Sequence, residues 1–131
     1  MTQECEDIPS AELLRAVDEF NRGDWYDCHD TLEELCVGEK GVLRDFYQGI
    51  LQVAVALHHW RNGNFRGAVI LLEKGVGLLR RVPPVYKDVD IDGLAIASER
   101  MHEALNTLGA ERMGELDPGL IPRLRLLHCL R

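Results

Sequence analysis

The chain has 131 residues, 28% of them charged, and a formal net charge of −7. This length favours one domain whose core needs neither a metal nor a disulfide. The acidic balance argues against nucleic acid or an anionic membrane as partner, because both are bound by clustered Lys and Arg. Cys5, Cys28, Cys36 and Cys129 show no zinc-ligand spacing, and the N-terminus lacks the pattern of a signal peptide. We therefore expect a reduced, cytoplasmic protein with free thiols and with no metal or cofactor.

The order of apolar stretches, caps and breakers predicts a single all-α domain of about five helices. Residues 1–9 are polar and acidic and are expected to form a flexible tail. Ser10 begins a first helix, Asp24 a second that ends at Gly38, and Asn64 a fourth that ends before Pro83. The third helix is expected at about 42–61 and the fifth at 90–109, after a polar connector. Residues 110–131 are expected to contain a short turn and a partly extended tail.

An internal repeat relates the first two pairs of helices. Residues 20–33 align without gaps on residues 60–73, an offset of forty, with aromatic, Gly, Asx cap, aromatic and small residues at matching positions. The pattern resembles a tetratricopeptide hairpin, although its period is longer than about 34 residues. It predicts two similar antiparallel helical hairpins in residues 10–82. The alignment pairs His29 with Val69, so the scaffold accepts an aliphatic side chain at that position.

The stretch from Phe46 to Trp60 has no formally charged side chain and is apolar on nearly its whole circumference. It is too short for a bilayer, which needs about 20 residues, and is typical of a central helix covered on several sides. Its exceptions are Gln48, Gln52 and His59, which at about 100° per residue lie within an arc of about 40°. We expect this polar stripe to be buried and hydrogen-bonded.

His29 and Glu33 share one face of the second helix. With the polar stripe they form a candidate polar site of His29, Glu33, Gln48, Gln52 and His59. Such a set could bind a small ligand or a metal, or act as an acid–base pair. It could equally be a satisfied buried network that fixes how the hairpins pack. We favour the network, in which replacing His29 by valine would leave a buried partner unpaired and cost about 1–3 kcal/mol.

Three blocks of the sequence form a distinctive combination: Cys-His-Asp-Thr-Leu-Glu at 28–33, Gln-Gly-Ile-Leu-Gln at 48–52 and Gly-Asn-Phe-Arg-Gly-Ala at 63–68. With these blocks the chain resembles the domain of unknown function 309 (DUF309) family over about residues 13–94. This resemblance implies an all-helical bundle and gives weight to the positions of His29, Glu33, Gln48, Gln52, Asn64 and Gly67. It implies no activity, because the family has none established. The chain departs from the family pattern at Asp30, where Glu is usual, and at Cys36, where Trp is usual.

Two functions follow from these patterns. The first is an interaction or scaffold module, with a second copy or another protein as its partner; the hairpin repeat and the lack of a recognisable catalytic set favour it. The alternative is a small-ligand-binding or metal-dependent hydrolytic domain that uses His29, Glu33, Gln48 and Gln52. A pocket open to solvent between the second and third helices would favour the alternative.

Overall fold

A computed structural model describes residues 9–127 and contains five α-helices in that range. They are α2 (Ala11–Asn21), α3 (Trp25–Cys36), α4 (Gly41–Arg61), α5 (Phe65–Leu79) and α6 (Ile91–Leu108). The predicted all-α bundle built from two helical hairpins is confirmed. The predicted N-terminal tail, apart from Pro9, lies outside the described residues, as do Cys5 and Cys129. Within residues 9–127 no helix is both long and apolar enough to cross a membrane.

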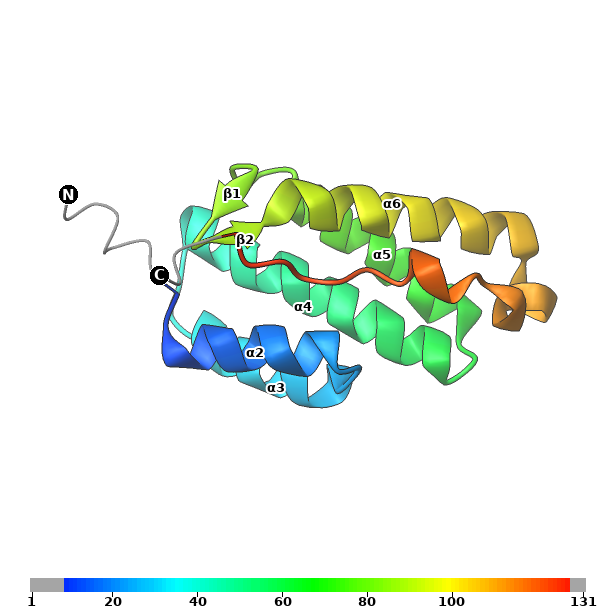
Figure 1. Ribbon diagram of the computed structural model, residues 1–131, viewed down its shortest axis with the longest axis horizontal. Coiled ribbons are helices and arrows are strands. Elements are labelled where there is room, and N and C mark those ends of the chain that lie inside the picture. The colour runs from blue at the N-terminus through cyan, green and yellow to red at the C-terminus, as the bar shows by residue number, and fades with distance from the viewer. Residues whose placement is uncertain (1–8, 128–131) are drawn as a thin grey trace.

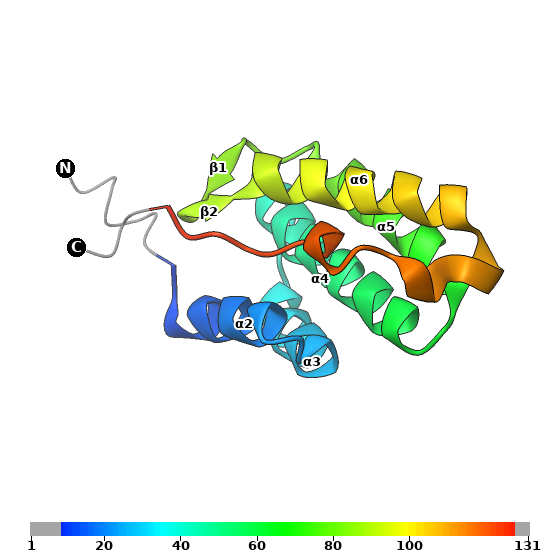
Figure 2. The same ribbon diagram turned by 45° about the vertical axis from the view of Figure 1, so that its right-hand side comes forward.

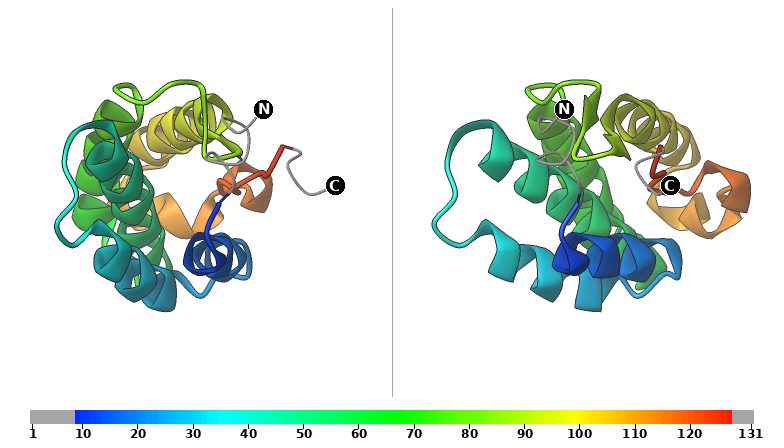
Figure 3. Two further views of the ribbon diagram at one scale, coloured as in Figure 1. Left: turned by 90° about the vertical axis from the view of Figure 1, so that its left-hand side faces the viewer. Right: turned by 60° about the vertical axis from the view of Figure 1, so that its left-hand side comes forward.

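The helices are arranged as an arc. Each packs mainly on the next in sequence, α2 on α3, α3 on α4, α4 on α5 and α5 on α6. Seen along the long axis of the molecule, this succession leaves one open side, which the C-terminal part of the chain occupies (Figure 3, left). The helical array therefore has an outer face and an inner face.

The turns of the two hairpins are built in the same way. Gly23 and Gly63 have φ of 82° and 79°, a left-handed conformation that glycine adopts without strain. In each turn the glycine N–H donates to the carbonyl three residues back, and the N–H of the following residue, Asp24 or Asn64, donates to the carbonyl five residues back. All four N···O distances lie between 2.8 and 3.1 Å. The forty-residue repeat in the sequence therefore corresponds to a repeat of the local structure.

The closest helix packing joins α4 to α5 through two glycines. A Cβ added to Gly49 would lie 2.7 Å from Leu79 Cδ2. One added to Gly75 would lie 2.8 Å from Val53 Cγ2 and 3.3 Å from the Val53 backbone nitrogen. At both positions the bare backbone is what allows the other helix to approach. Nine residues of α4 are buried, as its composition predicts.

The connector before α6 is a short β-hairpin, which the sequence analysis did not predict. Strands β1 (Val85–Tyr86) and β2 (Val89–Asp90) pair antiparallel. Lys87 and Asp88 between them have φ of 51° and 66°, the backbone of a type I′ turn. After α6 come two 3₁₀ helices, η1 (Ala110–Glu115) and η2 (Pro118–Leu120), and extended chain to residue 127. This last part runs back between α6 and α2 (Figure 1).

We expect Gly75→Ala to destabilise the protein by about 1–3 kcal/mol. The substitution improves helix propensity by up to about 1 kcal/mol, but the new methyl group meets the α4 backbone. Gly77→Ala in the same helix is the matched control, because nothing lies within 4 Å of its added Cβ; it should stabilise by about 0.5–1 kcal/mol. Urea denaturation followed by circular dichroism measures both. Equal midpoints for the two variants would contradict the close packing of α4 on α5.

Candidate functional site

The polar stripe of α4 faces solvent in part. Gln48, Gln52 and His59 are half-buried, and so is Val55, which lies between them on the same face. The three polar residues do share one face, as helical spacing predicts. The prediction that this face is buried is wrong, because α3 and α5 each pack on α4 and leave a strip of its surface uncovered. The polar stripe is thus a partly exposed strip of the α4 surface between these two helices.

At one end of this strip lies a pocket of about 280 Å³, here called the histidine pocket. Its lining residues come from the first turns of α3 and the last turns of α4: Trp25, Tyr26, His29, Val55, His58 and His59. The Tyr26 ring centroid lies 6.1 Å from that of His29 and 5.7 Å from that of His58. The wall is therefore an aromatic cluster, and its most exposed member is Tyr26, at 61%.

His29 contacts two carboxylates at the edge of the pocket. Its Nδ1 lies 3.2 Å from Asp30 Oδ1 and its Nε2 lies 3.7 Å from Glu33 Oε2. The Glu33 side chain is 62% exposed and that of Asp30 is 58% exposed. The prediction that His29 and Glu33 belong to a buried network is therefore wrong. Both residues are on the surface of α3, where water also solvates the carboxylates.

The two glutamines lie outside the pocket. Gln48 donates from Nε2 to Cys36 Sγ at 3.3 Å, which links α4 to the last turn of α3. Gln52 makes no side-chain hydrogen bond to the described part of the chain and lines a separate hollow with Lys74 and Arg81. The structure thus brings together three of the five predicted site residues, His29, Glu33 and His59, and separates them from the glutamines.

Cys28 lies on the buried side of α3 and is not a nucleophile for this site. Burial, with a smaller contribution from the Glu19 carboxylate, raises the pKa of the Cys28 thiol to about 12. The thiol is therefore protonated at neutral pH, and it donates to the Ala16 carbonyl at 3.4 Å. Its alignment with Ala68 in the second hairpin agrees with a packing role.

This region of the chain is similar to a known family. Residues 13–71 match the model of the domain of unknown function DUF309. The predicted family resemblance is confirmed. The match ends within α5, short of residue 94, where we expected the resemblance to end. It contains every residue that lines the histidine pocket.

Two curated relatives carry the name of an uncharacterised protein. The protein YpuF of Bacillus subtilis (strain 168) is 28% identical over 105 residues, which are 78% of this chain and 60% of YpuF. A protein of Aquifex aeolicus (strain VF5) is 25% identical over 83 residues, which are 62% of this chain and 25% of that protein. The chain thus covers less than two thirds of the length of either relative.

Asn64, Gly67 and His59 have a structural role in the α4–α5 turn. The DUF309 resemblance emphasises the first two, and the polar stripe contains the third. Asn64 Oδ1 accepts from the Gly67 N–H at 3.0 Å, so the amide nitrogen of Asn64 is the group 3.2 Å from His59 Nδ1. A Cβ on Gly67 would lie 2.9 Å from the His59 ring. Asn64, Gly67 and His59 therefore fix one another, and the neutral His59 ring carries its proton on Nε2.

Sequence reasoning missed Tyr26 and His58 as pocket residues. The repeat does indicate that Tyr26 has a role other than packing. Arg66 occupies the aligned position in the second hairpin, so the hairpin fold does not require an aromatic side chain there. His58 is half-buried. Its Nε2 lies 3.1 Å from Asn62 Nδ2, while its buried Nδ1 has no hydrogen-bond partner among residues 9–127.

We expect His29→Val to change the free energy of unfolding by less than about 0.5 kcal/mol. The carboxylates that contact His29 are exposed, so the substitution leaves no buried partner unpaired. Leu32→Ala, at a fully buried position in the same helix, should cost about 2–5 kcal/mol. Chemical denaturation of both variants at one pH measures this. A loss above 1 kcal/mol for His29→Val would restore the network interpretation.

We expect no stoichiometric metal in protein purified without chelator. His29, Asp30 and Glu33 do offer ligand atoms within 4.8 Å of one another. However, Asp30 lies beside Nδ1 of the His29 ring and Glu33 lies beside Nε2. A single ion can bind only one of these two nitrogens. Both carboxylates are also largely exposed, so nothing dry holds them in place. Elemental analysis tests this, and one equivalent of zinc that disappears in His29→Ala would contradict it.

Proposed function

We propose that this protein is an interaction module and that the histidine pocket is its docking surface for a partner protein. The observation that carries the proposal is the open aromatic wall, on which Tyr26 is 61% exposed beside the partly buried rings of His29 and His58. Tyr and Trp are the side chains that most often dominate binding energy at protein interfaces. Trp25, at the base of the wall, is buried and held by Arg61, whose guanidinium carbon lies 4.4 Å from the ring centroid.

The rim of the pocket indicates the chemistry of the partner. Asp30 and Glu33, which contact His29, are exposed on α3, in a chain whose net charge is −7. A partner segment with a Lys or Arg next to an apolar or aromatic side chain would place the cation on this rim and the apolar group on the aromatic wall. Opposite charges at the rim mainly increase the rate and specificity of association.

Catalysis by the predicted polar site has less support. Gln48 and Gln52 lie outside the pocket, and the Cys28 thiol is protonated and buried. What remains of the predicted polar site near the pocket is His29 with two exposed carboxylate neighbours, Asp30 and Glu33, and His59, whose Nδ1 is held by Asn64. Support for the interaction module comes from exposed aromatic surface, which catalysis does not need.

Photo-crosslinking tests the proposal. p-Benzoylphenylalanine replaces Tyr26 in one variant and Ile96 in a matched control, because Ile96 is also exposed, at 37%, but lies on α6. Irradiation of intact cells should give an adduct of defined mass from position 26 and none from position 96. Charge reversal by Glu33→Lys should reduce the adduct at least tenfold.

The mass of the adduct identifies the partner class. Twice the mass of the chain means a second copy, and any other mass means a different protein. Equal adducts from both positions, or none from position 26, would contradict the proposal.

A further inference from the structure

The inner face of the helical array is occupied by an extended stretch of the chain itself. Residues 121–127, here called the C-terminal segment, run lengthwise between α2 and α6 in both views of the molecule (Figures 1 and 2). The segment contacts parts of the chain far away in sequence. It therefore has the position that a bound peptide would have in a helical groove.

One side of the segment is held by Asn21 at the end of α2. The Asn21 side chain accepts from the Leu124 N–H at 2.8 Å and donates to the Leu124 carbonyl at 2.8 Å. Such a pair of hydrogen bonds binds the backbone of an extended strand and does not depend on its side chain. The Leu124 side chain is also buried.

The other side of the segment is held by the β-hairpin. The Asp90 N–H donates to the Arg125 carbonyl at 3.0 Å, and the Leu127 N–H donates to the Asp88 carbonyl at 2.9 Å. Val89 and Leu126 form an antiparallel bridge. The segment thus adds a strand to β2, which is a common way for proteins to bind an extended peptide.

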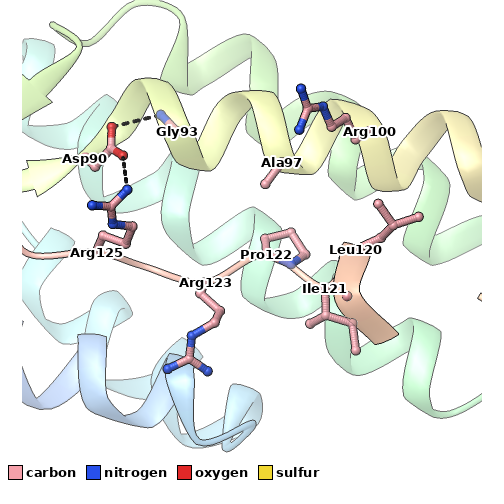
Figure 4. Close-up of a pocket in the computed structure, with 10 residues that line it drawn as sticks. Asp90, Gly93, Ala97, Arg100, Leu120, Ile121, Pro122, Arg123 and Arg125 are labelled. Carbon is pink, nitrogen blue, oxygen red and sulfur yellow. Dashed lines mark hydrogen bonds and ion pairs between the residues drawn. The ribbon is translucent and has the colours of Figure 1, made fainter. Parts of the chain in front are cut away.

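Between these anchors the segment fills its groove incompletely. A pocket of about 310 Å³ lies between α6 and residues 119–125. In Figure 4 Ala97 and Pro122 face each other across it, Arg125 lies beside Asp90, and Arg123 points away toward α2. Gly93 and Ala97 present almost no side chain on the α6 side. The groove therefore has room for a larger apolar side chain at the position of Pro122.

We propose that the inner face is a peptide-binding groove that takes an extended segment of a partner protein in place of the C-terminal segment. The partner segment has apolar residues at the positions of Pro122, Leu124 and Leu126, a bulky one at the first, and a cation at the position of Arg125. The cation would pair with Asp90, as Arg125 does at 4.0 Å. This groove is separate from the histidine pocket and does not depend on its function.

A segment from a second copy is the weaker competitor. Its contacts would be identical to those of the chain's own segment, which is present at an effective concentration of about millimolar because it is tethered. At micromolar protein concentration, the segment of a second copy therefore does not displace the tethered C-terminal segment. A partner with a larger side chain in the unfilled pocket gains apolar contacts that the resident segment lacks.

Binding of labelled peptides to the full chain tests the proposal. The probes are the nonapeptide of residues 119–127 and the same peptide with Leu in place of Pro122, both carrying a fluorophore. The Leu peptide should bind at least tenfold more tightly than the parent peptide. Ala97→Leu in the protein should abolish this difference, because it fills the same space.

A variant that releases the C-terminal segment from the groove gives a second test. Leu124→Asp in the full chain should strengthen binding of both peptides at least tenfold, and adding Asn21→Ala to it should weaken binding at least fivefold. Equal affinity of the two peptides for every protein, or no response to Leu124→Asp, would overturn the proposal. A concentration-dependent dimer lost in Leu124→Asp would assign the groove to a second copy, and would overturn it as well.

Hydrogen exchange on the unaltered protein guards against a variant that fails to fold. The Leu124 and Leu127 amides should exchange at least a hundredfold faster than that of the buried Leu57 in α4, because the segment opens without unfolding of the helices. Exchange of all three at one rate would mean that the segment opens only when the whole protein unfolds, and would refute a replaceable segment.

Discussion

The contact on which the structure depends is the close approach of α4 and α5 at Gly49 and Gly75. Because each glycine meets the other helix without a Cβ between them, the two helices pack at backbone distance, and α5 covers one side of α4. α3 packs on another side. What remains uncovered is one strip of α4, and the histidine pocket lies at the end of this strip. The position of the site is thus a consequence of helix packing.

The sequence predicted the helices and their repeat well, because both depend on local information. Asp24 and Asn64 precede the second helix of each hairpin, Gly23 and Gly63 take a left-handed conformation, and spacing alone places Gln48, Gln52 and His59 on one face. Whether that face is covered depends on how far apart α3 and α5 lie, which no local pattern encodes. The expectation of a buried network failed at this step.

The repeat also distinguishes residues that serve packing from residues of the histidine pocket. Leu32 and Leu72, which are identical in the two hairpins, are fully buried and serve packing. Two residues of the histidine pocket have no counterpart in the second hairpin, because Tyr26 is aligned with Arg66 and His29 with Val69. The second hairpin shows that the fold does not require these aromatic rings. This contrast supports the proposal that Tyr26 and His29 serve binding.

The two proposed binding surfaces differ in how they relate to the family. The residues that line the histidine pocket all lie within the stretch that matches DUF309, residues 13–71. From that stretch the inner groove takes the hydrogen bonds of Asn21 at the end of α2, and its other wall, α6 and the β-hairpin, lies beyond it. If both proposals hold, the outer pocket is the surface to expect across DUF309 domains. The inner groove and its resident segment would then be a feature added by the chain that follows the domain.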